Sequence, residues 1–480
     1  MSSQYLPAAG DVSVSNQKQP EIGLPSGWTR CSISDIAEVN PKKINAEPEE
    51  LAGFVPMANA PDTYFGQLII EKKFWGDIKK SYTNFRDGDV IVAKVTPCFE
   101  NGKASIVDKL PNGIGAGSSE FFVLRPRITS LSKRYLFSVI KSQKFLSDGA
   151  SNMTGAVGLR RVPRAFVEKF ELSLPPLAEQ KVIADKLDTL LAQVETTKAR
   201  LQRIPDILKR FRQSVLSAAV SGKLTEEWRC TPVLVDWKDS KVAHIVEKIE
   251  AGKNLKCIEA PPQKSEYGII KISAVTWGIY DEEQSKTLPD ETQFLETRRI
   301  NVGDFLISRA NTIELLGNPV IVHEVTKNLM LSDKVLRLVM KEKEKPWISI
   351  FLRSRRGRME IESRSTGNQM SMRNIGQKAL LDIDIPRPPE KEQAEIVRRV
   401  EELFQFADQV EQKANAALER VNNLTQSILA KAFRGDLTAD WRAENPDLIS
   451  GDNSAEALLE KIKAEREAMA PKKKTRKKKA

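Results

Sequence analysis

The residues best suited to chemistry are few, and their spacing forms no metal, phosphate or cofactor motif. The two histidines of the 480-residue chain, His244 and His323, belong to no cluster with the spacing of metal ligands, so we expect structural roles for both. The glycine-rich segment Gly113–Gly117 lacks the G-x-G-x-x-G spacing that cradles a dinucleotide, and no G-x-x-x-x-G-K-[ST] phosphate loop occurs. The Asn-Pro-Pro-aromatic motif of amino-methyltransferases is also missing from the sequence. We therefore predict a non-catalytic protein that itself binds no metal and no cofactor.

Cysteine usage and hydropathy bear on where the protein works. Cys31, Cys98, Cys230 and Cys257 lie far apart and form no C-x-x-C pair, which favours buried free thiols over a disulfide or a zinc site. No run of 18 apolar residues occurs, and the N-terminus lacks the basic-then-apolar layout of a signal peptide. We predict a cytoplasmic protein without a membrane segment.

The formal net charge of +11 is concentrated at the C-terminus. The last ten residues, PKKKTRKKKA, carry seven positive charges and no negative ones, so only +4 belongs to the rest of the chain. Bulk charge is therefore weak evidence that the body of the protein binds nucleic acid. We expect the tail to be disordered, and it is either a solvated terminus or a sequence-independent arm for phosphate backbones.

An internal repeat organises the chain. Residues 175–229 align with 388–442 at a constant offset of 213 without a gap, and 15 of the 55 positions are identical. Upstream the match is looser and its offset drifts: Trp28 corresponds to Trp237, FRDGDVIVAK to INVGDFLISR, and LRRV to MRNI. The chain therefore consists of two copies of one unit, of which only the second part is fixed in length.

Both copies of the 55-residue block predict a long helix with a coiled-coil seam. Apolar residues, with one threonine among them, recur at alternating steps of four and three. Antiparallel packing of the two helices would leave one globular part at each end, and would set Phe211 against Val400 and Val194 against Ala417. The seam positions are Ile183, Leu187, Leu190, Val194, Thr197, Leu201, Ile204, Leu208, Phe211 and Val215 in the first block, and Ile396, Val400, Leu403, Ala407, Val410, Ala414, Ala417, Val421, Leu424 and Ile428 in the second.

Prolines and glycines mark the expected helix ends. Each block begins with a Pro-Pro pair and closes with a glycine, Gly222 or Gly435, suited to the left-handed position after a helix. Pro205 is expected to kink or restart the first helix near Ile204. Its counterpart is Leu418, so the second helix can run straight.

Residues 23–174 and 231–387 are predicted to form strand-rich globular domains. Gly-Asp precedes a short apolar run in GDVIVAKV and in GDFLISRA, and EFFVLRP and KVLRLVM are typical of further strands. The predicted fold class is α+β, with two α/β domains separated by a long antiparallel coiled coil made from segments 175–230 and 388–446. Residues 1–22 are expected to form an N-terminal tail, and 447–480 a C-terminal segment that ends in the basic tail.

The sequence resembles the specificity subunits of type I restriction–modification enzymes, in particular those of the enteric group. The resemblance spans nearly the whole chain and is carried by PPLAEQ (175–180), LKRFRQSVLSAAVSGKLTEEWR (208–229), NNLTQSILAKAFRGDLTADWRAENPDL (422–448) and the Gly-Asp-apolar segments 88–92 and 303–307. It implies two target-recognition domains that each read one half of an asymmetric, interrupted double-stranded DNA site. It also implies that the coiled coil fixes the spacer between the two halves.

The same resemblance implies partner proteins. Two methyltransferase subunits would hold S-adenosylmethionine and methylate adenine, and two restriction/translocase subunits would bring ATP and Mg for translocation and cleavage. The internal repeat agrees with this, because a pseudo-two-fold chain can offer the same surface to two copies of one partner.

Polar side chains on loops of the two domains are the candidates for DNA contacts. Reading bases in the major groove needs long polar side chains, whereas phosphates are bound mainly by lysine and arginine. For any single candidate, the alternative is a solvated surface charge. The candidate base readers are Lys94, Thr96, Asn152, Arg160, Arg161, Arg309, Asn311, Asn368, Gln369, Arg373 and Asn374, and the candidate phosphate contacts are Lys72, Lys73, Lys79, Lys80, Arg353, Arg355, Arg356 and Arg358.

Two points remain open at the level of sequence. Trp228 and Trp441 stand at equivalent places just beyond the helix ends, where they either pack locally or contact the methyltransferase partner. The whole chain could instead be a DNA-binding regulator or scaffold whose coiled coil dimerises between chains, or a standalone methyltransferase of unrecognised type.

Overall fold

The computed structural model describes residues 23–127, 132–156, 158–234, 236–263, 265–369 and 372–469. The chain divides into two compact units: unit 1 comprises Met1–Arg200 and Leu418–Ala480, and unit 2 comprises Leu201–Ala417. The predicted N-terminal tail and the basic C-terminal tail fall outside the described residues.

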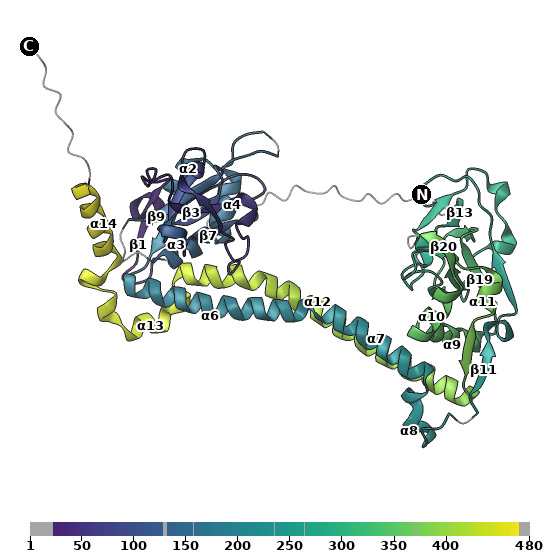
Figure 1. Ribbon diagram of the computed structural model, residues 1–480. Coiled ribbons are helices and arrows are strands. Elements are labelled where there is room, and N and C mark those ends of the chain that lie inside the picture. Colours follow the sequence, from purple (N-terminus) through teal and green to yellow (C-terminus); the bar gives the residue numbers. More distant parts are fainter. Residues whose placement is uncertain are drawn as a thin grey trace, which may run out of the picture. The chain divides into compact units, whose positions relative to one another are not determined.

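The globular part of unit 1 is built on two four-stranded sheets (Figure 1). The first has the strand order β2-β9-β6-β7 and is antiparallel throughout, whereas the second, β4-β3-β8-β5, contains the parallel pair β3–β8. A two-stranded ribbon, β1–β10, joins the beginning and the end of this part. The strands are β1 Thr29–Ser32, β2 Ala37–Val39, β3 Leu51–Val55, β4 Glu71–Phe74, β5 Thr83–Arg86, β6 Val90–Ala93, β7 Ala104–Ile106, β8 Ile114–Gly117, β9 Phe121–Pro126 and β10 Glu171–Leu174; the helices are α1 Ile33–Ile36, α2 Trp75–Ile78, α3 Lys133–Ile140, α4 Gln143–Ser151 and α5 Arg164–Lys169.

Unit 2 repeats this plan with shorter second-sheet strands. Its main sheet, β12-β19-β15-β17, has the order of the first sheet of unit 1, and its ribbon β11–β22 matches β1–β10. A three-stranded sheet, β14-β13-β18, again holds one parallel pair, β13–β18. The strands are β11 Lys238–Lys241, β12 Lys248–Ala251, β13 Tyr267–Ile270, β14 Ser285–Thr287, β15 Phe305–Ser308, β16 Ala310–Asn311, β17 Pro319–Ile321, β18 Asn328–Met330, β19 Val335–Val339, β20 Thr366–Gln369, β21 Met372–Asn374 and β22 Asp384–Arg387; the helices are α9 Lys345–Arg353, α10 Arg355–Arg364 and α11 Gln377–Leu381.

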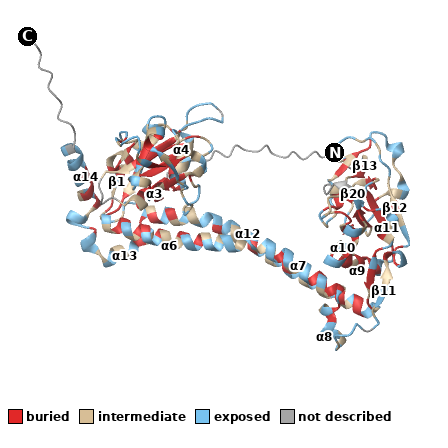
Figure 2. Cartoon of the chain, viewed as in Figure 1, coloured by how far each residue is buried: buried red, intermediate tan, exposed pale blue. Residues whose placement is uncertain are grey.

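The strands predicted from the Gly-Asp signatures form the centre of each main sheet. All four residues of β6 and all four of β15 are buried, because both faces of these strands are covered. Figure 2 shows buried residues gathered in the interior of the globular part of each unit. EFFVLRP and KVLRLVM form β9 and β19, their direct neighbours. The sequence thus predicted these four strands, although not their pairing, and the repeat is a repeat of fold as well as of sequence.

Three long helices complete the two units: α6 (Leu177–Gln202), α7 (Ile204–Val220) and α12 (Glu390–Arg434). The predicted break at Pro205 is confirmed, since α6 ends at Gln202 and α7 begins two residues later with proline in its first turn. The predicted straight run past Leu418 is also confirmed, because α12 continues without interruption for 45 residues. Gly222 and Gly435 both adopt positive φ, 74° and 80°, immediately beyond the helices.

Within each unit the long helices pack in opposite directions. In unit 2, Arg212 of α7 pairs with Asp408 and Glu411 at 2.7 and 2.9 Å, while Leu224, further along, accepts a hydrogen bond from Arg399. Residue numbers on α12 therefore fall as those along α7 and beyond it rise, as expected for antiparallel packing. The predicted register is wrong, because Arg212, the neighbour of Phe211, contacts residues 408 and 411 and lies about three turns from Val400. In unit 1, residues of α6 share a core with Leu429 and Ala432 near the C-terminal end of α12.

The predicted seam is only partly buried. Thr197 and Leu424 are exposed, and Leu190 is half-buried whereas its neighbour Leu191 is buried. The reason is that α6 also lies against the globular part of unit 1, where Ile183, Leu187 and Leu191 join the main core. A straight helix of 3.6 residues per turn drifts from a strict seven-residue repeat, so the buried face shifts along its length.

The expectation of four buried cysteines holds only in part. All four are free, but only Cys31 is buried, and Cys230 is exposed in a turn with a positive φ of 58° just after the short helix Glu226–Arg229. None of the helices in the described part of the chain is both long enough and apolar enough to span a membrane.

Candidate nucleic-acid interface

Two segments far apart in the sequence meet beside the main sheet of unit 1. The chain leaving β6 forms an antiparallel bridge between Val95 and Arg161, and Arg161 also bridges Thr154. Hydrogen bonds from Thr96 N to Arg160 O and from Val162 N to Lys94 O complete the pairing. The candidate base readers predicted on two separate loops therefore lie on one small patch, which we call readout patch 1 (residues 94–96, 152–154 and 160–162).

Unit 2 contains the same arrangement. After β15, the short strand β16 pairs with β21, so that Ala310 lies opposite Asn374 and Asn311 opposite Arg373. At the offsets of the repeat, the pair Ala310–Asn374 corresponds to Val95–Arg161 of unit 1. In the sequence, both loops were recognised from their equivalent positions in the two copies of the repeat. In the structure, the two loops of each copy are paired with each other, once in unit 1 and once in unit 2. We call residues 309–311 and 372–374 readout patch 2.

Several side chains of readout patch 1 already have partners within the protein. Arg161 makes two hydrogen bonds to Glu120, at 2.9 and 3.0 Å, which lower the pKa of that carboxyl group. Thr96 donates to Glu100 at 2.9 Å, and Arg160 lies 3.8 Å from the same carboxylate. Each arginine is nearly half exposed, so an incoming phosphate or guanine can compete for its guanidinium.

The remaining candidates of unit 1 differ in exposure. Asn152 is exposed and donates to Asp148 O at 2.8 Å, and the ammonium of Lys94 lies 5.6 Å from the ring centre of Phe122. Among the proposed phosphate contacts, Lys72 and Lys80 are exposed, Lys79 is half-buried and Lys73 lies over the ring of Phe54 at 3.8 Å.

In readout patch 2, some side chains are exposed and others are hydrogen-bonded within the protein. Arg309 and Asn374 are exposed, while Asn311 donates to Thr276 at 3.2 Å. Arg373 donates to Ser365 O at 2.8 Å and to Gly367 O at 2.6 Å, so it holds the beginning of the neighbouring strand β20. The side chains of Asn368 and Gln369 lie outside the described residues.

The four arginines predicted to contact phosphate fall into two classes. Arg355 and Arg356 are exposed at the start of α10. Arg353 lies over the ring of Phe404, and burial, together with the nearby Arg212, lowers its pKa. Arg358 donates to the backbone oxygens of Ile313 and Leu316, and burial lowers its pKa as well. Arg353 and Arg358 therefore point into the protein in this conformation.

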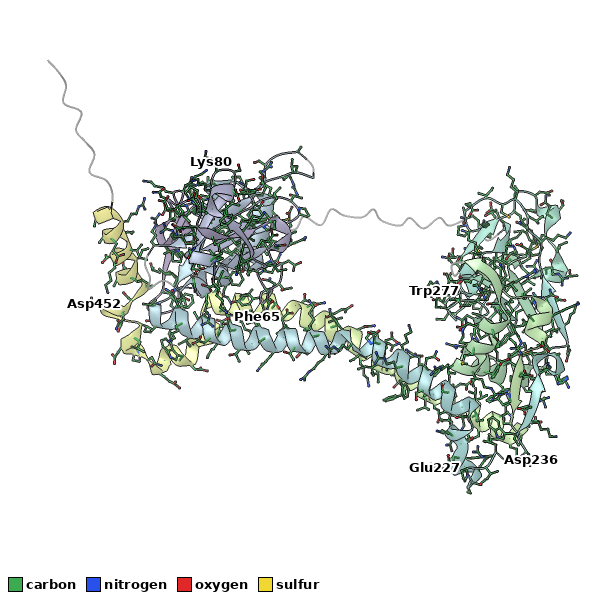
Figure 3. The ribbon with its side chains drawn as sticks, viewed as in Figure 1. Phe65, Lys80, Glu227, Asp236, Trp277 and Asp452 are labelled. Atoms are coloured by element: carbon green, nitrogen blue, oxygen red, sulfur yellow. The ribbon has the colours of Figure 1, made fainter. Side chains whose placement is uncertain are left out.

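Sequence reasoning missed one exposed apolar loop next to readout patch 2. Trp277 and Ile279 are 75% and 77% exposed (Trp277 is labelled in Figure 3). The preceding Thr276 is hydrogen-bonded to Asn311 and, through its carbonyl oxygen, to Asn318 at 2.9 Å, which anchors the loop beside the patch. These two exposed apolar side chains stand close together in the chain, and an exposed apolar patch is typical of a surface that contacts a partner. The only available sequence signal was the Trp-Gly pair after an apolar run.

A second missed feature is a buried polar cluster at the helix ends of unit 1, which we call cluster 1. The carboxylate of Glu179 is fully buried and accepts hydrogen bonds from Trp28 Nε1 at 2.8 Å, Thr438 Oγ1 at 2.6 Å and Arg442 Nη1 at 2.5 Å. It thus ties the first turn of α6 to the segment after α12 and to the start of the globular part.

Cluster 2 repeats this arrangement in unit 2 with exchanged partners. Glu392, at the start of α12, accepts from Trp237 Nε1 at 2.9 Å and Thr225 Oγ1 at 2.7 Å, and it pairs with Arg229. Each glutamate therefore binds the threonine and arginine of the other copy of the block. The sequence showed these residues as identical, but only antiparallel helices bring them together in this way.

The two tryptophans beyond the helix ends lie next to these clusters. Trp228 is 44% exposed and Trp441 is half-buried. The adjacent arginines, Arg229 and Arg442, are the ones that enter the clusters. Local packing therefore leaves a large part of Trp228 available for a partner.

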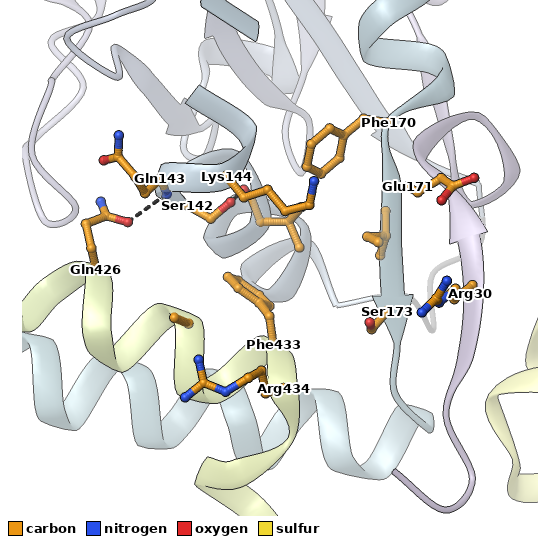
Figure 4. A pocket seen from close by; sticks show the side chains of 13 residues that line it. Arg30, Ser142, Gln143, Lys144, Phe170, Glu171, Ser173, Gln426, Phe433 and Arg434 are labelled. Carbon is orange, nitrogen blue, oxygen red and sulfur yellow. Dashed lines mark hydrogen bonds between the residues drawn. The ribbon is translucent and has the colours of Figure 1, made fainter. Parts of the chain in front are cut away.

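No enzyme-like site stands out in the described part of the chain. A cavity of about 470 Å³ in unit 1 lies between α4, β10 and α12 and is lined by Phe170, Phe433 and the cations Arg30, Lys144 and Arg434 (Figure 4). One side is closed by a hydrogen bond from Gln143 N to Gln426. Ser142, the N-cap of α4, donates to Val139 O, so it is not arranged as a nucleophile. Among the described residues, no group of three histidines, cysteines or carboxylates could hold a metal ion.

Comparison with known proteins gives a consistent result. A family model described as "Type I restriction modification DNA specificity domain" matches residues 25–206 and 234–420. The chain is 39% identical over 477 residues to the type I restriction enzyme EcoKI specificity subunit of Escherichia coli K12, covering 95% of this chain and 99% of that one. It is 35% identical over 481 residues to the StySPI specificity subunit of Salmonella potsdam, with the same two coverages.

Solved structures agree at the level of fold. The HsdS subunit of Thermoanaerobacter tengcongensis superimposes with a TM-score of 0.61 at 19% identity, covering 87% of this chain and 99% of that one. A chain from a structure of type I R-M complex assembly and conformational transition gives a TM-score of 0.59 at 20% identity, covering 86% and 99%.

Proposed function

Since the chain belongs to the family of type I restriction–modification specificity subunits, we propose that it reads a bipartite DNA site through its two globular domains. It is the DNA-recognition subunit of such a system. The proposal assigns one half-site to domain 23–174 and the other to domain 231–387. The observation that carries it is the twofold occurrence of the readout patch, built from equivalent segments that carry different side chains.

Divergence between the two patches supports an asymmetric site. Where patch 1 has Thr96 and Arg161, patch 2 has Asn311 and Asn374. Arginine favours guanine, whereas asparagine favours adenine, so the two domains would recognise different bases. Phosphate contacts from the exposed Lys72, Lys80, Arg355 and Arg356 would position the protein without adding sequence information.

The long helices are proposed to form one antiparallel coiled coil that sets the spacer. The two grooves must be engaged at a set rotational phase of about 10 bp per turn, and a helical rod of constant length provides that phase. Support comes from the gapless alignment of the two blocks and from the exchanged partners of clusters 1 and 2. Inserting four residues into both blocks is expected to lengthen the spacer and leave both half-sites unchanged.

We further propose that this subunit is non-catalytic and assembles with two methyltransferase and two restriction/translocase subunits in the cytoplasm. S-adenosylmethionine, ATP and Mg would be bound by those partners. The duplicated helix ends, with Trp228 and Trp441, offer the methyltransferases two equivalent surfaces.

Methylation mapping tests the proposal. The chain is expressed with its methyltransferase partner in methylation-free cells, and modified adenines are mapped by direct long-read sequencing. A single bipartite motif with a fixed gap, absent when this chain is omitted, is the expected result. Co-purifying proteins that methylate no motif would contradict the reader function, and a failure to co-purify would favour the standalone regulator.

A further inference from the structure

Each readout patch is followed by a loop of the same length that ends in a glycine with positive φ. In unit 1 this loop runs from Pro97 to Gly102, whose φ is 71°, and in unit 2 from Thr312 to Gly317, whose φ is 67°. The two glycines correspond at the offset of 215 that relates β6 to β15. The loops directly continue the segments that carry Thr96 and Asn311, so the path of each loop fixes where those side chains are presented.

A buried cation binds the backbone of the unit 1 loop. Lys141, at the end of α3, is only 6% exposed, and its ammonium donates to Gly102 O at 2.7 Å and Asp62 O at 2.6 Å. Burial lowers the pKa of Lys141 to about 8, partly offset by Asp62. Among the described residues, no carboxylate forms an ion pair with this ammonium. Burying a charge without an ion-pair partner is unfavourable, so the two carbonyl contacts, together with the ring of Phe137 at 6.0 Å, stabilise the ammonium.

In unit 2 a different cation, Arg358, binds the backbone of the corresponding loop. The guanidinium of Arg358, in the first turn of α10, donates to Ile313 O at 2.7 Å and to Leu316 O. No described carboxylate pairs directly with it, although Glu362 and Glu314 act on it from a longer distance. The two carbonyls belong to the loop that leads to Gly317.

The two cations are not equivalent positions of the repeat. At the offset of 213, Lys141 corresponds to Ser354, and Arg358 corresponds to the buried Phe145. Ser354 caps α10, and Phe145 packs on Phe99 at 5.8 Å, so neither replaces the missing cation. The position of the cation has changed between the copies, while its target, the backbone of the loop after the readout strand, has stayed the same. If the two cations served only to stabilise the fold, they would not need to bind the same loop in both units.

We propose that Lys141 and Arg358 are positioning residues for DNA recognition, each fixing the loop that presents the base-reading side chains of its own unit. Neither cation contacts DNA in this proposal; it acts through the loop. The inference rests on the proposed function and adds two specificity-determining residues that lie away from the DNA-facing surface.

The test maps methylation motifs for variants in the complete methyltransferase complex. Lys141→Met and Arg358→Met remove the donors while keeping an unbranched apolar side chain of similar reach. Each is expected to reduce discrimination at one half-site by about tenfold or more, because a charged hydrogen bond contributes more than a neutral one, and to leave the other half-site and the gap unchanged. Lys141→Arg, which keeps a donor, is expected to restore most of the discrimination.

Matched controls and outcomes separate this inference from the proposed function. Lys144→Met removes an exposed lysine on the neighbouring helix and Lys378→Met an exposed lysine of α11; both should leave the motif intact. A wild-type complex without a bipartite motif would refute the proposed function. Two results would overturn the positioning role. In the first, the Lys141→Met and Arg358→Met variants fold and keep the wild-type motif. In the second, both variants relax the same half-site.

A milder variant covers the case in which the methionine variants do not fold. Arg358→Gln stays polar but removes the charge and replaces the two guanidinium arms by one shorter amide donor, so it cannot hold the carbonyl oxygens of both Ile313 and Leu316. It is expected to relax the unit 2 half-site alone. An unchanged half-site in this variant would also overturn the proposal.

Discussion

Replacing Glu179 by glutamine is expected to destabilise unit 1 selectively. Its buried carboxylate accepts from Trp28, Thr438 and Arg442, and so connects three separate segments of the chain. Glutamine keeps one acceptor oxygen but removes the charge, and it presents an amide group to donors. The guanidinium of Arg442, whose side chain is 13% exposed, then loses its counter-ion.

The size of the effect follows from removing one member of a buried ion pair, which costs about 3–5 kcal/mol. Because the introduced glutamine retains one acceptor oxygen, we expect a loss of about 3 kcal/mol, at the lower end of that range. For a domain of this size each kcal/mol shifts Tm by about 2–4 °C, so unit 1 should melt about 6–12 °C lower. Hydrogen exchange followed by mass spectrometry assigns the change: amides of α6 and of the C-terminal part of α12 should exchange about 100-fold faster.

Two variants serve as controls for this measurement. Glu419→Gln changes an exposed carboxylate on α12 and should alter neither unit, while Glu392→Gln should transfer the same loss to unit 2. Adding Arg442→Met to the Glu179→Gln variant should recover part of the loss, because the glutamine still offers an acceptor oxygen and no unpaired charge remains. Unchanged exchange in Glu179→Gln, or faster exchange in unit 2 alone, would refute the assignment of cluster 1 as the clamp of unit 1.

Three further predictions follow from the same structure. Trp228→Ala should lower the free energy of unfolding by about 1–2 kcal/mol, because the side chain is only partly buried, but it should weaken co-purification with the methyltransferase more strongly; retention of full binding would favour purely local packing. Gly222→Ala should destabilise unit 2 by about 1–3 kcal/mol in urea unfolding, because alanine disfavours φ = 74° and its Cβ would lie 2.3 Å from Leu234 Cδ2. Burial lowers the pKa of Lys141 to about 8, so this side chain releases its proton more readily in the folded than in the unfolded state. Its contribution to the free energy of unfolding should therefore rise between about pH 8 and 10.5. Lys141→Met should remove that rise, and identical pH profiles of stability for both proteins would contradict the prediction.

The sequence predicted the long helices, their break and their ends because these depend on local rules. Proline at 205 and glycine at 222 and 435 act through their own backbone geometry, and the repeat doubled every such signal. The readout loops could also be located, since their place after the Gly-Asp strands recurs in both copies. What remains a prediction is the role of each side chain at the DNA.

The clusters and the buried cations could not be predicted, because they depend on contacts between distant segments. Glu179 and Arg442 are 263 residues apart, and only the antiparallel order of the helices joins them. Arg358 is of a residue type that commonly contacts phosphate at a surface, yet its guanidinium is bound by the backbone oxygens of the loop 313–316. Thr197 and Leu424 fit the seam in sequence but are exposed, because the buried face of each helix shifts along its length.

The central claim is that each unit reads its own half-site, and paired variants mapped in one methylation experiment test it most directly. Arg160 and Arg161 are replaced by alanine in patch 1, and Arg309 and Asn374 in patch 2, in otherwise identical complexes. We predict that the first pair relaxes one half of the motif, the second pair relaxes the other half, and the gap stays constant. Loss of discrimination in both halves from a single pair, or a change in the gap, would contradict the account.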